Sequence, residues 1–226
     1  MAELQYFGHS FFKISDSNST ILIDPVFETS KSEGKKKAKF KVKQSDFKKV
    51  SLILITNETN EHFDPKAVEE LALKHNALVV AHEIALQKLN LPRNLKSPIV
   101  SNADISLRGV KIKAKTAHYP KSFYPLGYLL EMMGGKKIYH AGVTSLLDDF
   151  NQVKTNVALL PISSRSMDVV DAVRATKLMK PDFVVPMQYD VFEEKKIDVP
   201  DFKRRIEKSV LKTKPILLDM GATFKF

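Results

Sequence analysis

One stretch of the chain limits its possible folds more than any other: an apolar run at 52–55 leads directly into a polar loop over 56–64, and a helix is predicted at 66–76. Consecutive apolar residues bounded by polar ones are typical of a strand buried on both faces. Asp64 and Pro65 suit the N-cap and the first position of the helix. A buried strand, a polar loop and a helix in this order predict an α/β fold with its chemistry in the loop.

The rest of the chain alternates between short β-type runs and helical patterns. Helices are predicted at 83–89, 168–179 and 201–211, and a hairpin turn at 16–19. The order is strands, then α/β, then strands, then α/β, which predicts two mixed β-sheets packed as a sandwich with helices on both outer faces. The whole chain, 1–226, is expected to form one domain. Strands are predicted at 4–7, 11–14, 20–23, 51–56, 78–81, 105–107, 110–116, 127–132, 137–140, 158–161, 183–186, 215–218 and 223–226.

The composition excludes several kinds of site. A hydrophobic content of 43% in 226 residues is enough for a sizeable core. The absence of cysteine excludes disulfides, thiolate metal sites and a cysteine nucleophile. No apolar run is long enough to span a bilayer, and the first residues lack the pattern of a secretory leader, so we expect a cytoplasmic protein.

The chain is strongly basic, with a formal net charge of +10, and much of the excess lies in one segment. This charge favours anionic partners such as nucleic acid, anionic lipid or phosphorylated metabolites. Lys39 to Lys43 alternates polar and apolar residues, which predicts a short strand inside the segment. We favour a solvated loop, with nucleic-acid binding as the alternative. The lysines of this Lys31–Lys49 loop are Lys31, Lys35, Lys36, Lys37, Lys39, Lys41, Lys43, Lys48 and Lys49.

Several short motifs, in order along the chain, resemble the metallo-β-lactamase superfamily. The branch with the best resemblance includes ascorbate-6-phosphate lactonase and related small hydrolases. The resemblance implies a four-layer αββα sandwich and a site for two metal ions. The motifs are Gly8-His9-Ser10, Ile21 to Pro25, Asp64-Pro65, Ala117-His118, Ile138 to Thr144, Leu160-Pro161-Ile162, Met167-Asp168, Lys180-Pro181 and Val185 to Tyr189.

The sequence departs from that family at the metal ligands. The resemblance implies histidines at the positions of Asn57 and Thr59 and an aspartate at Glu61, while His62 is kept. His118 aligns with a later histidine ligand. Two further ligands are replaced, the bridging aspartate by Val143 and the last histidine by Gln188.

The replacements change what the loop can bind. Zinc prefers imidazole and carboxylate ligands, and a full structural zinc site supplies roughly 10–16 kcal/mol. Asn57, Thr59, Val143 and Gln188 are uncharged, which is expected of a site that no longer has a cation to balance clustered carboxylates. The remaining donors, Glu61, His62 and His118, allow one reduced metal site for zinc or manganese, or hydrogen bonds within a polar cavity. We favour the cavity, and no cofactor.

Other polar residues near these motifs are given structural roles. His9 and His140 are each expected to be either a satisfied structural histidine or a histidine at the edge of the pocket. Asp24 either lies near the site or caps a turn. Arg165 lies in the expected pocket loop, where it could bind an anion, although we favour an exposed loop arginine.

Three functions remain open. The favoured one is a non-catalytic protein, a pseudoenzyme, whose pocket binds a small anionic ligand or a protein partner. The second is a hydrolase of a lactone, ester or phosphoester with one metal on Glu61, His62 and His118, and with Asp64 or Glu58 moving protons. The third is a nucleic-acid-associated subunit that uses the Lys31–Lys49 loop. The favoured pocket is lined by Asn57, Thr59, Glu61, His62, His118 and Gln188.

Overall fold

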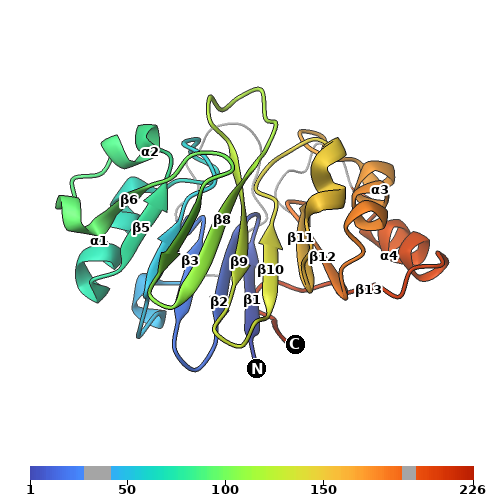
Figure 1. The fold of residues 1–226 in the computed structure, drawn as a ribbon, viewed down its shortest axis with the longest axis horizontal. Helices are drawn as coiled ribbons and strands as arrows, with labels where there is room; N and C mark the ends of the chain where they lie inside the picture. The colour runs from blue at the N-terminus through green and yellow to red at the C-terminus, as the bar shows by residue number, and fades with distance from the viewer. Residues whose placement is uncertain (28–41, 190–196) are drawn as a thin grey trace.

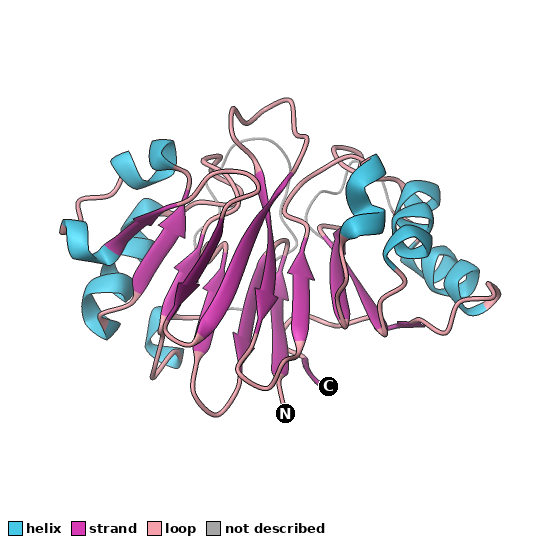
Figure 2. Cartoon of the chain, viewed as in Figure 1, coloured by secondary structure: helices cyan, strands magenta, loops and turns pink. Residues whose placement is uncertain are grey.

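Two β-sheets lie face to face at the centre of the computed structural model, which describes residues 1–27, 42–189 and 197–226 (Figures 1 and 2). This arrangement confirms the predicted sandwich of two mixed sheets. The first sheet has the order β14-β1-β2-β3-β4-β5-β6. Its strands are β1 (Glu3–Gly8), β2 (Phe11–Ser15), β3 (Thr20–Ile23), β4 (Leu52–Leu54), β5 (Leu78–Ala81), β6 (Lys96–Pro98) and β14 (Thr223–Lys225).

The second sheet has the order β13-β12-β11-β10-β9-β8-β7. Both sheets mix antiparallel pairs, such as β1 with β2, and parallel pairs, such as β3 with β4 and β10 with β11. The strands of the second sheet are β7 (Asp104–Leu107), β8 (Val110–Thr116), β9 (Leu126–Glu131), β10 (Lys137–His140), β11 (Val157–Pro161), β12 (Phe183–Met187) and β13 (Lys214–Pro215).

Helices cover the outer side of each sheet (Figure 1). The helices α1 (Pro65–His75) and α2 (Glu83–Gln87) lie beside the first sheet, where α2 contacts β5 and β6. The helices α3 (Val169–Met179) and α4 (Val199–Glu207) lie beside the second sheet, where α3 contacts β11. Short 3-10 turns complete the description: η1 (Gln44–Asp46), η2 (Arg93–Leu95) and η3 (Asp148–Gln152).

The helix after the central loop begins where the sequence predicts. The side chain of Asp64 accepts a hydrogen bond from the backbone N–H of Ala67, and Pro65 follows at the first helical position. The helix ends at Asn76, whose left-handed backbone (φ 51°) closes the last turn. Val68 and Leu71 are fully buried, so this face packs onto the sheet.

Three clusters of buried side chains hold the layers together. The largest lies between the two sheets and includes Leu4 and Phe12 from the first sheet, and Tyr128 and Leu159 from the second. The other two clusters lie between each sheet and its own helices. Each fully buried large apolar side chain contributes about 1.5–3 kcal/mol relative to exposure, so the central cluster makes the largest contribution of the three.

Some predicted boundaries are wrong. The last helix begins at Val199, not at 201, because Asp198 caps it by accepting from Asp201 N–H. The strand predicted at 215–218 is shorter in the structure: β13 is Lys214–Pro215, and its hydrogen bonds to β12 end with the one from Ile216 N–H to Val184 O. The strand β6 was not predicted. The strand predicted inside the Lys31–Lys49 loop lies mainly outside the described residues.

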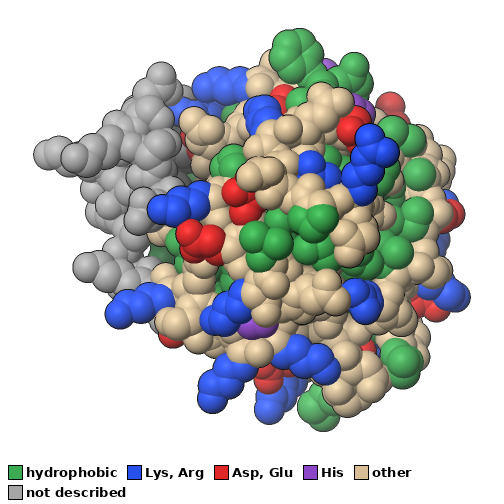
Figure 3. Space-filling model, turned by 90° about the vertical axis from the view of Figure 1, so that its left-hand side faces the viewer, with side chains coloured by type: hydrophobic (Ala, Val, Ile, Leu, Met, Phe, Trp, Pro, Cys, Tyr) green, Lys and Arg blue, Asp and Glu red, His purple; other side chains and the backbone are tan. Residues whose placement is uncertain are grey.

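The outer surface beside the first sheet carries charges of both signs. On the face shown in Figure 3, lysine and arginine side chains are spread out, with acidic side chains among them. None of the helices in the described ranges is long and apolar enough to cross a membrane.

Candidate functional site

Hydrogen bonds join the loops that follow the central strands at one edge of the sandwich. Leu126 N–H donates to Thr56 O over 2.8 Å, which ties the start of β9 to the loop after β4. Gln188, just after β12, contacts both the turn between β1 and β2 and the loop after β10. The predicted site loop therefore lies in contact with the loops of the other sheet.

The centre of this region is a buried hydrogen-bond cluster around Asp24. Its Oδ1 accepts from the backbone N–H of Thr56 at 2.8 Å, and its Oδ2 accepts from the Thr56 hydroxyl at 2.6 Å. The same Oδ2 lies 2.7 Å from Nδ1 of His62, and all three residues are buried. Asp24 has φ 48°, a left-handed conformation that aspartate tolerates better than most residues. Asp24 is therefore part of the site and orients His62.

The other ring nitrogen of His62 is the least satisfied group of the cluster. Because a carboxylate only accepts hydrogen bonds, the Asp24 pair requires a proton on Nδ1, and in the neutral ring Nε2 is then an acceptor. Nε2 is buried and has no hydrogen-bond partner within the described part of the chain. The ring of His9 lies beside it, with 4.9 Å between the ring centroids. An unpaired buried acceptor of this kind is costly and marks a position for a further partner.

Glu61 is paired with a cation from another loop. Its Oε1 lies 2.7 Å from Nη1 of Arg165, and both side chains are about one-quarter exposed. Arg165 also hydrogen-bonds the hydroxyl of buried Tyr119. Burial of Tyr119 and the negative charge of Glu61 together raise its pKa above the usual range, although Arg165 opposes the rise. The predicted metal ligand Glu61 is thus part of an ionic cluster with Arg165 and Tyr119.

Asn57 and Thr59, for which the resemblance implies histidine ligands, stabilise the loop itself. Asn57 is buried, and its Oδ1 accepts from both the backbone N–H (3.0 Å) and the hydroxyl (2.6 Å) of Thr59. The carbonyl of Thr59 in turn accepts from the N–H groups of His62 and Phe63 at 2.9 Å each. Asn57 and Thr59 therefore fix the loop conformation that presents His62.

Gln188 joins the two sheets at this edge. Its amide Nε2 donates to Ser10 Oγ at 2.7 Å and to Gly142 O at 3.1 Å, and its backbone N–H donates to His9 O at 3.2 Å. Gln188 is buried and has φ 68°. Val143, at the expected position of a bridging aspartate, is buried and apolar. Both donors of the Gln188 amide are used by the protein.

His140 is a satisfied structural histidine, as the sequence predicts. Its Nδ1 accepts from Gly142 N–H at 3.1 Å, and its Nε2 donates to Ser10 O at 3.1 Å. Complete burial lowers the pKa of His140 to about 4, with the negative charge of Asp24 opposing this shift. The ring is therefore neutral, with its proton on Nε2.

The two carboxylates considered for proton transfer, Asp64 and Glu58, both accept hydrogen bonds from backbone N–H groups. Asp64 caps α1. Glu58 accepts from the hydroxyl of Ser122 at 2.7 Å and from Phe123 N–H at 3.0 Å. Burial acts to raise the pKa of Glu58, but these hydrogen bonds and the charge of Lys88 lower it overall. Both carboxylates therefore accept structural hydrogen bonds, which does not favour either of them as a general acid that donates a proton.

The donor set does not fit the two-metal site that the resemblance implies. No group of three or more His, Cys, Asp or Glu side chains that could hold a metal ion occurs among residues 1–27, 42–189 and 197–226. Glu61 is paired with Arg165, and His118 has an exposed side chain, its backbone N–H donating to Thr144. Among the three predicted ligands, His62 has the arrangement of a metal-binding histidine, with Nδ1 on a carboxylate and no partner for Nε2 in the described part of the chain. Metal binding by Glu61, His62 and His118 remains a prediction.

The sequence analysis did not identify three residues of the site, Thr56, Ser10 and Tyr119. Thr56 and Ser10 carry no charge, and Tyr119 directly follows the predicted ligand His118. The role of Tyr119 depends on Arg165, which lies 46 positions away (165 − 119). Their contacts follow from the meeting of separate loops.

Comparisons with known proteins agree with this fold. Residues 3–188 match the family model of the β-lactamase superfamily domain. A UPF0173 metal-dependent hydrolase of Nanoarchaeum equitans is 33% identical over 218 residues, covering 91% of this chain and 92% of that protein. A UPF0173 metal-dependent hydrolase of Staphylothermus marinus is 32% identical over 256 residues, covering 100% of both.

Solved structures show the same architecture. Igni18, a novel metallo hydrolase from Ignicoccus hospitalis, has a TM-score of 0.81 and 26% identity, covering 100% of this chain and 99% of that one. The chain therefore belongs to the β-lactamase superfamily and, within it, to the UPF0173 metal-dependent hydrolases, which confirms the resemblance carried by its motifs.

Proposed function

We propose that this protein is a non-catalytic member of its hydrolase family, which uses the old pocket to bind a small anionic ligand or a protein partner without metal. The observation that carries the proposal is the 2.7 Å contact between Glu61 and Arg165. A guanidinium beside Glu61 supplies the positive charge that a metal would otherwise supply. A second cation there would be repelled by Arg165.

The neutral replacements support the same conclusion. The amide of Asn57 hydrogen-bonds Thr59, and the amide of Gln188 hydrogen-bonds Ser10 and Gly142. A metal on the Asn57 oxygen would have to displace the two hydrogen bonds from Thr59, and amide oxygens are weak zinc ligands to begin with. An anionic ligand would have to share the Arg165 guanidinium with Glu61, which the five N–H donors of a guanidinium allow.

A second candidate rests on the His62 ring. Asp24 holds Nδ1, and Nε2 is buried with no partner among the described residues, which is the arrangement of a histidine that binds metal through its outer nitrogen. Under this alternative, a hydrolase would hold one metal ion on His62, with Glu61 released from Arg165 and His118 turned inward. The metal would supply Lewis-acid activation of water when bound. The names of the relatives fit this alternative.

Metal content separates the two. The full chain, purified without chelator, is analysed for metals and then titrated with zinc and manganese by calorimetry. The non-catalytic proposal expects no stoichiometric metal and no saturable heat. About one metal per chain, lost in His62→Ala but kept in the control His75→Ala, would refute it and support the hydrolase.

Arg165→Ala tests the physical reason. Removing the guanidinium leaves Glu61 free to bind a cation, so this variant is expected to gain zinc affinity over the parent chain. If the parent binds no zinc and Arg165→Ala binds none either, the Glu61–Arg165 pair is not what excludes the metal, and the argument from that pair is wrong.

A further inference from the structure

The loop between β8 and β9, residues 117–125, projects beyond the ends of the strands (Figure 1). Near its start Tyr119 is buried, and the hydroxyl of Tyr119 hydrogen-bonds Arg165 of the candidate site. Near its end the side chains of Phe123 and Tyr124 are 85% and 49% exposed. A single loop therefore joins the cation of the pocket to an exposed aromatic pair.

The carboxylate of Glu58 fixes this loop on the site loop over 56–64. Its Oε2 accepts from the hydroxyl of Ser122 at 2.7 Å, and its Oε1 accepts from the backbone N–H of Phe123 at 3.0 Å. The N–H of Ser122 donates to Tyr119 O at 3.1 Å, which closes a turn. The backbone position of Phe123 is thus set by the protein itself, before a ligand is bound.

The ring of Phe123 is open to a partner. Its neighbour Tyr124 stacks on His82, with 4.0 Å between the ring centroids and 11° between the planes. Phe123, in contrast, has no ring contact among the described residues. An aromatic side chain that a fixed backbone presents to solvent can anchor a ligand at a low cost in entropy.

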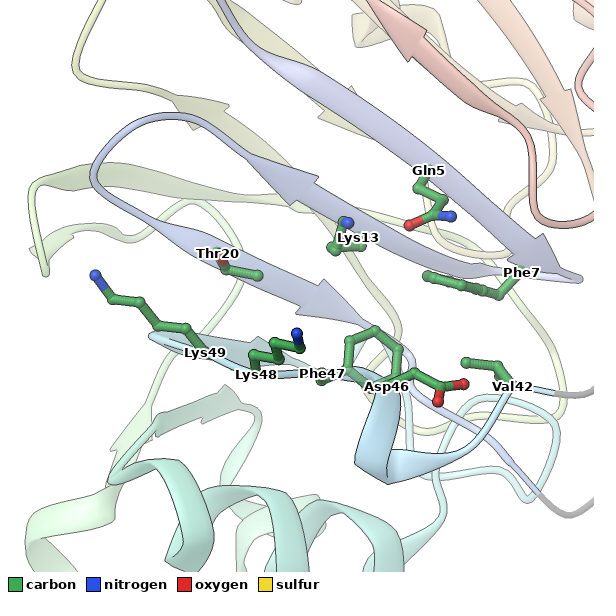
Figure 4. Close-up of a pocket in the computed structure, with 9 residues that line it drawn as sticks. All are labelled: Gln5, Phe7, Lys13, Thr20, Val42, Asp46, Phe47, Lys48 and Lys49. Atoms are coloured by element: carbon green, nitrogen blue, oxygen red, sulfur yellow. The ribbon is translucent and has the colours of Figure 1, made fainter.

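A groove on the outer face of the first sheet shows a different arrangement (Figure 4). It has a volume of about 450 Å³, and its lining includes lysine and phenylalanine side chains. Phe7 in this lining already packs on Phe11 and Phe47, with 4.8 and 5.5 Å between the ring centroids. The aromatic rings of that groove are used within the protein, whereas Phe123 is not.

The buried and exposed parts of the loop are close together. The first and fourth Cα atoms of a turn lie within about 7 Å, and Phe123 directly follows the turn that Tyr119 begins, so their Cα atoms lie within about 11 Å of each other. Tyr119 contacts Arg165, and Arg165 contacts Glu61 at 2.7 Å. A charged position and an apolar position are therefore adjacent at this edge.

We propose that Phe123 forms an apolar rim of the pocket, and that the ligand is a small anion with an aromatic or aliphatic group. This inference rests on the proposed function, because it places the anionic group at Arg165, shared with Glu61. The apolar group covers the ring of Phe123, and both gain from burial and contact. Glu58 is the positioning residue of this rim.

The test is NMR titration of the full chain with phenylacetate, acetate and 2-phenylethanol. Phenylacetate carries both the charge and the ring, so it should bind at least about threefold more tightly than either of the others. Phenyl phosphate and inorganic phosphate repeat the comparison with a second anion. Phe123→Ser should remove the preference for the aromatic anions and leave the binding of acetate and phosphate unchanged.

Glu58→Gln tests the positioning role. The NH₂ group of glutamine cannot accept the hydrogen bond that one carboxylate oxygen accepts. The amide of Phe123 should therefore exchange its hydrogen with solvent faster in this variant, and the preference for phenylacetate over acetate should fall. Faster exchange with an unchanged preference would overturn the positioning role of Glu58.

The control Val210→Ser removes a fully exposed apolar side chain that follows α4, and it should leave the preference unchanged. An equal loss in this control would overturn the rim, and equal binding of phenylacetate and 2-phenylethanol would overturn the link to Arg165. Saturable binding of acetate or phosphate without any preference for the aromatic anions would overturn this inference and keep the proposed function. Binding of none of the probes would overturn the inference as well, whereas a stoichiometric metal ion would refute the proposed function alone.

Discussion

Replacement of Asp24 by asparagine tests whether the buried cluster orients His62. In Asp24→Asn the remaining oxygen can still accept from Thr56 N–H, but the new NH₂ takes the position of Oδ2. In the parent, Oδ2 accepts from the Thr56 hydroxyl and faces Nδ1 of His62. Because an NH₂ group only donates, Thr56 Oγ1 and His62 Nδ1 must both accept hydrogen bonds in the variant. The His62 ring can do this only by moving its proton from Nδ1 to Nε2.

The expected cost follows from the bonds that change. Two charge-assisted hydrogen bonds become neutral ones, so Asp24→Asn should lower the free energy of unfolding by about 1–3 kcal/mol. Asp24→Ala leaves the Thr56 N–H unpaired and leaves the Thr56 hydroxyl and His62 Nδ1 with each other, 3.2 Å apart, as a remaining contact. Because each buried group left unsatisfied costs about 1–3 kcal/mol, this variant should cost more than Asp24→Asn, about 2–5 kcal/mol. For a chain of this length, each kcal/mol lowers the melting temperature by roughly 2–4 °C.

Two measurements check this prediction. Urea unfolding gives the free energies, with Asp104→Asn as a control on an exposed carboxylate, expected within about 0.5 kcal/mol of the parent. Nitrogen NMR of the histidine rings reports which nitrogen of His62 carries the proton. If Asp24→Asn keeps both the parental stability and a proton on Nδ1, Asp24 does not set the tautomer and the reasoning is refuted.

Two further predictions concern the same edge of the sandwich. Gly142→Ala should lower the free energy of unfolding by at least about 2 kcal/mol, because the new Cβ would lie 2.5 Å from Leu126 O and the residue has φ 68°. Urea unfolding measures this free energy. The control Gly134→Ala, which has open space around the new Cβ, should show no such loss. The second is a pH dependence from His140, whose pKa of about 4 when folded lies below the usual 6.5. Below pH 6.5 only the unfolded chain takes up this proton, so the contribution is complete above 6.5 and falls by roughly 3 kcal/mol towards pH 4. An NMR titration in which the His140 ring becomes charged near pH 6.5 in the folded protein would contradict this.

The fold was largely predictable because its strands and helix caps are local features. Asp64 and Pro65 predict the start of α1 from adjacent positions alone, and the structure agrees. The wrongly predicted boundaries lie in strands whose extent is set by pairing with a neighbouring strand. The strand at 215 ends early because its pairing depends on β12, and Lys96–Pro98 becomes a strand only by pairing with β5.

The site was less predictable, because its contacts join distant parts of the chain. The sequence drew attention to Glu61 and His62 through their loop, but it gave no indication that Glu61 pairs with Arg165. Likewise, Asp24 could be interpreted as a turn cap until the structure placed it against His62. The motif supplies the candidates, whereas the pairing of their side chains is a property of the assembled loops.

The bonds that hold Ser10 have a consequence for the order of folding. Ser10 receives a hydrogen bond from the ring of His140 and another from the amide of Gln188, contacts that span 130 and 178 positions of the chain. Contacts of such long sequence separation form late, because closing a large loop costs entropy before any bond repays it. The hairpin of β1 and β2 leaves the ribosome first, yet its turn cannot be fixed until β12 has been synthesised and has joined its sheet. The pocket is therefore among the last parts of the molecule to be completed, and a chain that stops short of Gln188 would carry the hairpin without a finished site.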